Sequence, residues 1–96
     1  MKKDAQFKFR LYVAGEAPNS AQALANLNAI CLAHLSDRHE IAVVDVFKEP
    51  GRALADGIFL TPTLIKLWPL PMRRIVGTLS QAEVVLQALG LEAVTV

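Results

Sequence analysis

The chain has 96 residues, of which 53% are hydrophobic, 20% charged and 6% aromatic, and its formal net charge is +1. A chain of this length holds one small core and leaves no room for a separate substrate domain. The near-neutral charge argues against a nucleic-acid-binding module, which would carry an excess of Lys and Arg. We therefore expect a single domain over residues 1–96, with its core at about 7–90 and a short tail at each end.

The cysteine content and the first residues bear on the cellular setting. A single cysteine, Cys31, excludes an internal disulfide and agrees with a reducing cytoplasm. Residues 1–4 resemble the basic start of an export signal, but Lys8 and Arg10 place charge where such a signal is apolar. The apolar runs are too short to cross a bilayer. We expect a cytoplasmic protein with no membrane partner, and its apolar excess predicts a surface for another protein.

The first half of the chain predicts a strand, a helix and a second strand. Apolar and polar residues alternate at 7–13, which is typical of a strand with one buried face. A helix is predicted at about 20–35, where Asn19 and Gln22 form a variant of the capping box. The β-branched run at 41–47 predicts a strand covered on both faces. This order indicates a right-handed βαβ unit with parallel strands.

The second half predicts a short helix at 52–57, a hairpin of strands at 61–68 and 73–77, and a helix at 81–89. Ser80 and Glu83 form a capping box for that last helix, and Gly90 ends it. The resulting order, β-α-β-(α)-β-β-α, is the thioredoxin-like arrangement of an α/β protein, with a mixed sheet flanked by helices. In that arrangement a cis-proline precedes the third strand, where Pro62 follows Thr61.

Residues that carry chemistry elsewhere have structural explanations here. The first strand is not followed by a C-x-x-C motif, so thiol oxidoreduction is excluded. The single cysteine, Cys31, is interpreted as a core residue. The spacing of His34 and His39 does not match a zinc site, and no glycine-rich phosphate loop is present. Asp45, within an apolar run, is interpreted as a polar residue at a strand end. We expect neither an enzyme nor a protein that binds a metal or cofactor.

The segment 61–77 is the unusual part of the sequence. It contains Pro62, Pro69 and Pro71, followed by the adjacent pair Arg73 and Arg74. The prolines are explained by a wide turn between two strands, although they also permit a slow conformational equilibrium. If the arginines lie in a strand they point to opposite faces, so at most one serves a given interface. Each is either solvated or a carboxylate-binding anchor at a subunit contact.

Several motifs lie in order over about 7–89. They are Leu-Tyr-Val-Ala-Gly at 11–15, Pro-Asn-Ser at 18–20, Val-Asp-Val at 44–46, Thr-Pro-Thr-Leu at 61–64, Lys66, Pro-Leu-Pro-Met-Arg-Arg-Ile-Val-Gly at 69–77 and Leu-Ser at 79–80. With these motifs the chain resembles the KaiB family of circadian clock proteins. The first and the longest of them, in this order, are specific to that family.

The resemblance implies a non-enzymatic protein that binds the ATPase ring of a KaiC-like hexamer and modulates its timing or stress-response output. A KaiA-like protein or a histidine kinase is a further partner, and the alternative is an input module like the N-terminal domain of the histidine kinase SasA. It also implies self-association as a dimer or tetramer. Carried over by position, the candidate partner contacts are Lys66, Arg73 and Arg74.

The family is also known for two folds, which differ in the C-terminal half. The resemblance places Pro62, Pro71 and Gly77 in the segment that rearranges. The alternative to the thioredoxin-like fold is therefore the family's ground-state fold, in which the C-terminal half is rearranged. Three positions depart from the cyanobacterial pattern, namely Gln22, Gly57 and Thr78. These departures favour a KaiB-like paralogue over the central oscillator component, with a thioredoxin-like resting state.

Overall fold

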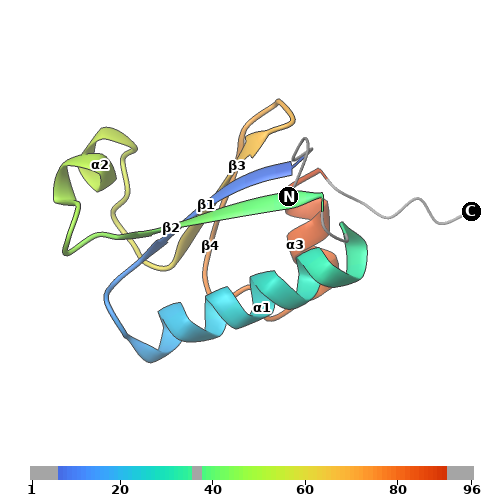
Figure 1. The fold of residues 1–96 in the computed structure, drawn as a ribbon, viewed down its shortest axis with the longest axis horizontal. Helices are drawn as coiled ribbons and strands as arrows, with labels where there is room; N and C mark the ends of the chain where they lie inside the picture. Colours follow the sequence, from blue (N-terminus) through green and yellow to red (C-terminus); the bar gives the residue numbers. More distant parts are fainter. Residues whose placement is uncertain (1–6, 36–37, 91–96) are drawn as a thin grey trace, which may run out of the picture.

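The computed structural model describes residues 7–35 and 38–90 (Figure 1), so the two predicted tails lie outside the described residues. The elements are β1 (Phe7–Val13), α1 (Pro18–His34), β2 (His39–Asp45), α2 (Pro50–Ala55), β3 (Thr63–Trp68), β4 (Arg73–Val76) and α3 (Ala82–Ala88). Each corresponds to a predicted element, and the boundaries differ by a few residues at most.

The four strands form one sheet in the order β2-β1-β3-β4. β1 runs parallel to β2, with Phe7 opposite His39 and Val13 opposite Asp45. β3 is antiparallel to both β1 and β4, and the Thr61–Pro62 bond before β3 is cis. The predicted thioredoxin-like arrangement is therefore confirmed, and the C-terminal half does not have the alternative arrangement.

Helices cover the two faces of the sheet unequally. α1 and α3 lie on one face, whereas the short α2 lies over one end of the other (Figure 1). Because successive strand residues point to opposite faces, β1 contributes to two cores. Phe9, Leu11 and Val13 pack in the larger core with side chains of α1 and α3. Tyr12 packs in a smaller core with Val44, Ala53 and Ile65.

The predicted capping box at the start of α1 is wrong. The helix begins at Pro18, with Ala17 at the N-cap and no capping hydrogen bond from a side chain. Proline suits the first turn because its missing N–H has no partner there in any helix. Ser20 is buried, and its Oγ accepts a hydrogen bond from the backbone N–H of Ala14 at 3.0 Å, which ties the helix to the end of β1.

The capping box predicted for α3 is also wrong. The N-cap is Gln81, again without a capping side-chain hydrogen bond. Leu79, two residues earlier, has a positive φ of 62° and a buried side chain, so tertiary packing directs the chain into this helix. At the other end Gly90 adopts a φ of +72°, as predicted for the residue that ends the helix.

β2 differs most from expectation. It is an edge strand, and Val43 is 46% exposed, so the prediction that both of its faces are covered is wrong. The strand ends at Asp45, whose Oδ1 accepts the backbone N–H groups of Phe47 at 2.9 Å and Gly15 at 3.1 Å. The carboxylate therefore starts a turn, in agreement with its interpretation as a strand-end residue.

Candidate partner-binding site

Lys66 and Arg73 are directly opposite each other on β3 and β4. They share the face that packs against α1 and α3, and their nitrogens converge near the end of α3. A Cβ built on Gly90 would lie 3.9 Å from Lys66 Nζ and 3.8 Å from Arg73 Nε. The carbonyl groups at a helix C-terminus carry partial negative charge, which favours cations at this position.

Lys66 is only 3% exposed, whereas Arg73 is exposed. Within residues 7–35 and 38–90, neither forms an ion pair with an acidic side chain. Burial lowers the pKa of the Lys66 ammonium, and the neighbouring charge of Arg73 lowers it further. The positive charges of Lys66 and Arg73 are thus compensated only by the partial charge at the end of α3. A carboxylate from a partner would find two hydrogen-bond donors here, the Lys66 ammonium and the Arg73 guanidinium.

Arg74 points to the opposite face, as predicted for adjacent strand residues. Its guanidinium donates to the carbonyl of Asp56 at 2.6 Å and to that of Gly57 at 3.2 Å. Both carbonyls follow the last residue of α2, so Arg74 fixes the C-terminal end of that helix while remaining exposed. Arg74 therefore binds the end of α2, whereas Arg73 lies near the end of α3.

A second polar group at the end of α2 was not predicted from the sequence. The carboxylate of Asp56 accepts hydrogen bonds from the buried Tyr12 hydroxyl and, at 2.9 Å, from Arg10. The hydrogen bond from Tyr12 contributes most to lowering the pKa of Asp56, and Arg10 acts in the same direction. Burial, followed by the bond to Asp56, raises the pKa of Tyr12. The only signal in the sequence was the alternation that puts Arg10 and Tyr12 on one face of β1.

The three candidate switch residues do not all lie together. Pro62 and Gly77 are neighbours, because the backbone N–H of Gly77 donates to the carbonyl of Pro62 at 3.0 Å. Pro71 lies at the far end of the hairpin, in the turn between β3 and β4. Gly77 has a φ of 125°, a conformation that side-chain-bearing residues rarely adopt.

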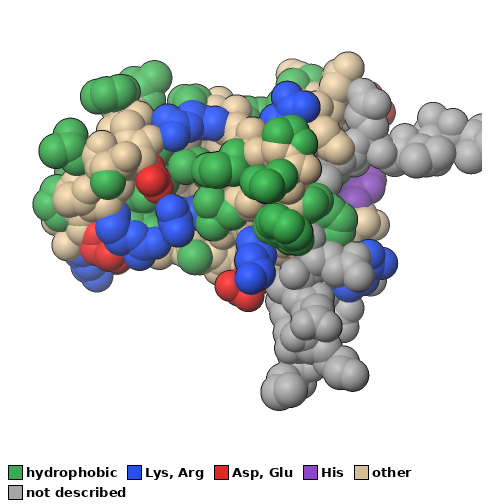
Figure 2. Space-filling view, turned by 90° about the horizontal axis from the view of Figure 1, so that it is seen from above, with side chains coloured by type: hydrophobic (Ala, Val, Ile, Leu, Met, Phe, Trp, Pro, Cys, Tyr) green, Lys and Arg blue, Asp and Glu red, His purple; other side chains and the backbone are tan. Residues whose placement is uncertain are grey.

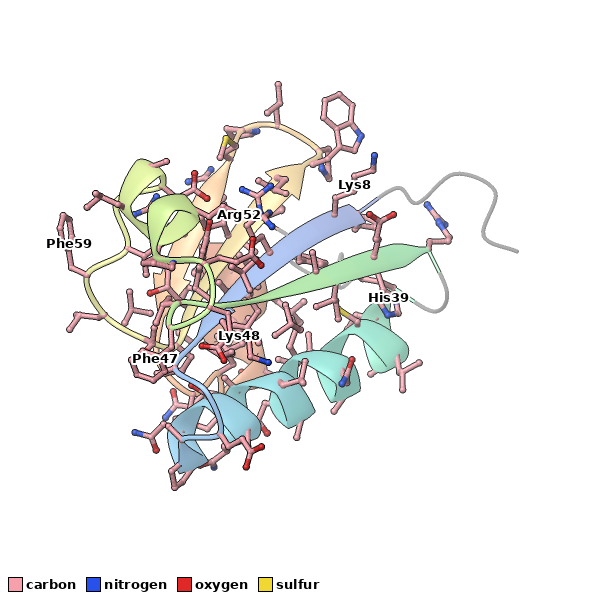
Figure 3. All side chains as sticks on the ribbon, turned by 60° about the vertical axis from the view of Figure 1, so that its left-hand side comes forward. Lys8, His39, Phe47, Lys48, Arg52 and Phe59 are labelled. Atoms are coloured by element: carbon pink, nitrogen blue, oxygen red, sulfur yellow. The ribbon has the colours of Figure 1, made fainter. Side chains whose placement is uncertain are left out.

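Apolar side chains are exposed around α2. Phe59 is 86% exposed and Phe47 73% exposed, and Figure 3 shows both at the α2 end of the molecule, in the segments that flank the helix. Leu54 and Leu60 are exposed nearby. In Figure 2, which views the α2 face of the sheet, Lys and Arg side chains lie between hydrophobic groups. Such a mixture of aromatic, aliphatic and arginine groups is typical of protein interfaces.

Two shallow cavities border β4. One of about 140 Å³ is lined by residues 57–60 and by Thr63, Arg74 and Val76. The other, of about 200 Å³, lies at the turn into α3 and is lined by Ile75–Gln81, Val84 and Val85. The residues around the second cavity include no acid, base or thiol. Neither cavity places a nucleophile beside a general base, which hydrolytic chemistry would need.

Two further features are absent from the part of the chain that the structure describes. None of its helices has the length and apolar character needed to span a membrane. No three side chains of His, Cys, Asp or Glu in residues 7–35 and 38–90 are grouped so that they could hold a metal ion.

Comparison with known proteins assigns the chain to a family. The KaiB domain model matches residues 10–91. The chain belongs to the KaiB family. It is 48% identical over 82 residues to the circadian clock oscillator protein KaiB of Synechococcus elongatus, covering 85% of this chain and 80% of that protein. It is 45% identical over 85 residues to the circadian clock protein KaiB3 of Synechocystis sp., covering 88% and 81% respectively.

Solved structures resemble this KaiB-family chain in fold. The N-terminal domain of SasA from Synechococcus elongatus matches with a TM-score of 0.74 and 19% identity, covering 100% of this chain and 94% of that domain. Mitochondrial thioredoxin 3 from Saccharomyces cerevisiae matches with a TM-score of 0.69 and 13% identity, covering 93% and 80%. At such low identity the likeness concerns the fold alone.

Proposed function

We propose that this KaiB-family protein is a non-enzymatic regulator that binds a KaiC-like hexameric ATPase and modulates its timing or stress-response output. The match of the KaiB domain over residues 10–91 is the observation that carries the proposal. The named relatives are circadian clock proteins, and the likeness to them extends over most of the chain. A function of this kind requires a binding surface and no reacting groups.

Arg73 and Arg74 are the proposed contacts on β4. Both are exposed, and they face opposite sides of the sheet. A partner that docks on one side of the sheet therefore contacts only one of them directly. Arg74 is the stronger candidate because it lies on the same side as α2 and lines one cavity with the exposed Phe59. Lys66 is buried on the opposite face of the sheet, directly across from Arg73, and it acts on a partner through the position and charge of Arg73.

Binding to a purified KaiC-like hexamer in the presence of ATP tests the proposal. We expect Arg74→Ala to weaken binding by about 1–3 kcal/mol, or roughly 5- to 150-fold in Kd, as for an interface anchor. Lys8→Ala is the control, because Lys8 is an exposed cation on β1 away from α2. No binding by the unmodified protein in any phosphorylation state of the hexamer would contradict the proposal.

The family resemblance also leads us to propose that the segment with Pro62, Pro71 and Gly77 rearranges between two folds. A second set of NMR resonances is then expected for residues 58–90, exchanging slowly with the first, while residues in β1 and α1 keep one environment. A single set of resonances across temperature and protein concentration would contradict this.

A second candidate function is that of an input module for a separate histidine kinase, and a KaiA-like protein is a further possible partner. The chain shares its fold with the SasA N-terminal domain, and the kinase alternative itself comes from the family resemblance. Capture of a kinase that lacks its own domain of this fold, with no capture of the hexamer, would replace the first candidate by the second.

A further inference from the structure

Two positively charged side chains without an acidic partner meet at the C-terminal end of α3. Lys66 is 3% exposed, and within residues 7–35 and 38–90 its ammonium forms neither an ion pair nor a hydrogen bond. Arg73 lies directly opposite on β4 and likewise has no acidic partner among these residues. A buried charge is destabilising unless it is paired and hydrogen-bonded. The pair of cations therefore favours an anion beside it.

Gly90 leaves room for such an anion. A Cβ built on this residue would lie 3.9 Å from Lys66 Nζ and 3.8 Å from Arg73 Nε, so one point in space is almost equally far from both nitrogens. Apart from the residues next to Gly90 in the chain, no other described residue has an atom within 4 Å of that point. The central atom of an oxyanion stands about 4 Å from a nitrogen that donates to one of its oxygens. A small oxyanion near this point therefore accepts hydrogen bonds from both side chains.

The end of α3 adds hydrogen-bond acceptors to the two donors. The helix ends at Ala88, two residues before Gly90. The last carbonyl groups of a helix have no partner in a following turn, carry partial negative charge and point out of its C-terminal end. An oxyanion that has only acceptor oxygens, such as sulfate, is repelled by these carbonyl groups, whereas one that carries a hydroxyl group donates to them. The combination of two cations and carbonyl groups therefore favours the second kind of ion.

We propose that Lys66, Arg73 and the C-terminal end of α3 form a binding site for a small oxyanion that carries a hydroxyl group, namely hydrogen phosphate or hydrogen carbonate. The two side chains donate to its oxygens, and its hydroxyl group donates to a carbonyl of α3. The site lies on the face of the sheet that α1 and α3 cover, whereas Arg74 lies on the other face. It requires no partner protein, so tests on the protein alone distinguish its failure from failure of the proposed function.

NMR titration of the full chain with hydrogen phosphate, at mildly alkaline pH and constant ionic strength, is the first test. We expect shifts that saturate and that are confined to the surroundings of Lys66 and Gly90. Sulfate is the matched probe, because at this pH it has the same shape and charge but no hydroxyl group. It is expected to bind about tenfold more weakly or less, since it forms one hydrogen bond fewer and faces the carbonyl groups.

Hydrogen carbonate is titrated in the same way, and the ion with the lower Kd is assigned to the site. Saturable binding of neither ion would overturn the inference. Binding of sulfate as tight as that of the other two would show an adventitious ion only, and it would overturn the inference as well.

Substitutions on the two faces of the sheet locate the ion. Arg73→Gln is expected to raise the Kd for the assigned ion about tenfold or more, because it removes one of two charged donors. Lys66→Met is expected to abolish saturable binding. Arg52→Gln is the matched control, since it removes the same charge from the exposed side of α2 on the other face, where solvent and salt screen it from the site. Equal weakening by Arg73→Gln and Arg52→Gln would refute the site.

A methyl group at Gly90 tests the position of the ion. Gly90→Ala puts a carbon atom at the point between the two nitrogens and is expected to raise the Kd about tenfold or more. Gly57→Ala is the matched control, because Gly57 has a similar φ of +68° and its Cβ would lie 3.9 Å from Arg74 Nη1 on the other face. Both variants are titrated by NMR under conditions in which they are folded. Unchanged binding in Gly90→Ala, or equal weakening in both variants, would contradict the proposed position.

Discussion

Asp56 is expected to be the residue whose loss most weakens the attachment of α2 to the sheet. Asp56→Ala removes the charged acceptor of the buried Tyr12 hydroxyl, which costs about 1.5–3 kcal/mol for a bond of this kind. The carbonyl of Arg52, at 3.3 Å, is the remaining acceptor. The ion pair with Arg10 adds about 0.5 kcal/mol, because side chains that are 26% and 30% exposed are partly screened by solvent.

The total of about 2–3.5 kcal/mol corresponds to a fall in Tm of about 8–28 °C for a chain of this size. Urea and thermal unfolding followed by circular dichroism measure it. Glu49→Ala is the control, because that carboxylate pairs with Arg52 at 3.2 Å on the exposed side of the same helix. The control is expected to change stability by less than about 0.5 kcal/mol.

A double-mutant cycle and a pH series isolate the interaction. In a Tyr12→Phe background Asp56→Ala is expected to cost about 1–2 kcal/mol less, since the hydroxyl is already absent. Because the pKa of Asp56 is lowered in the folded state, the unfolded carboxyl takes up its proton first as the pH falls. The stability that Asp56 adds is therefore complete above the ordinary carboxyl pKa of about 4, and it is lost as the pH falls toward the lowered pKa of the folded state. Equal losses in both backgrounds would refute the reasoning.

Three further substitutions test other contacts, each by urea unfolding. Lys66→Met is expected to raise the unfolding free energy by about 1 kcal/mol at pH 7, because it removes a buried charge. Burial lowers the pKa of Lys66 in the folded state, so the unfolded state holds the proton to higher pH and the unmodified protein gains stability toward pH 10; the variant is expected to lose this gain. A lower unfolding free energy in the variant would contradict this. Gly90→Ala is expected to cost about 1 kcal/mol because of its φ of +72°, and an unchanged stability would count against backbone strain. Asn26→Ala is expected to cost about 1 kcal/mol through the 2.7 Å bond to the Thr78 carbonyl, and no loss would show that this bond is dispensable.

Features set by residues close in sequence were largely predictable. The alternation at 7–13 and the position of Gly90 gave β1 and the end of α3 correctly. The opposite orientation of Arg73 and Arg74 also follows from strand geometry alone. The capping boxes failed because neighbouring contacts override local preference: the chain enters α1 with Ser20 bonded to Ala14, and the buried Leu79 sets the direction in which it enters α3.

Features set by distant residues were not predictable. Tyr12 and Asp56 are 44 residues apart, and no local pattern links their side chains. The burial of Lys66 depends on where α3 packs against the sheet. The edge position of β2 was missed because a continuous apolar run predicts a central strand, whereas only the strand order reveals which strands lie outside.

The hydrogen bonds from Arg74 to the carbonyls that follow α2 have a consequence for recognition. Two of the five N–H groups of this guanidinium are committed to those carbonyls, so the group is held in one orientation and presents its remaining donors in a fixed direction. A carboxylate that approaches along that direction meets a preorganised hydrogen-bonding partner, which lowers the entropy lost on binding. The arginine therefore favours a partner whose acidic group is already positioned over the end of α2.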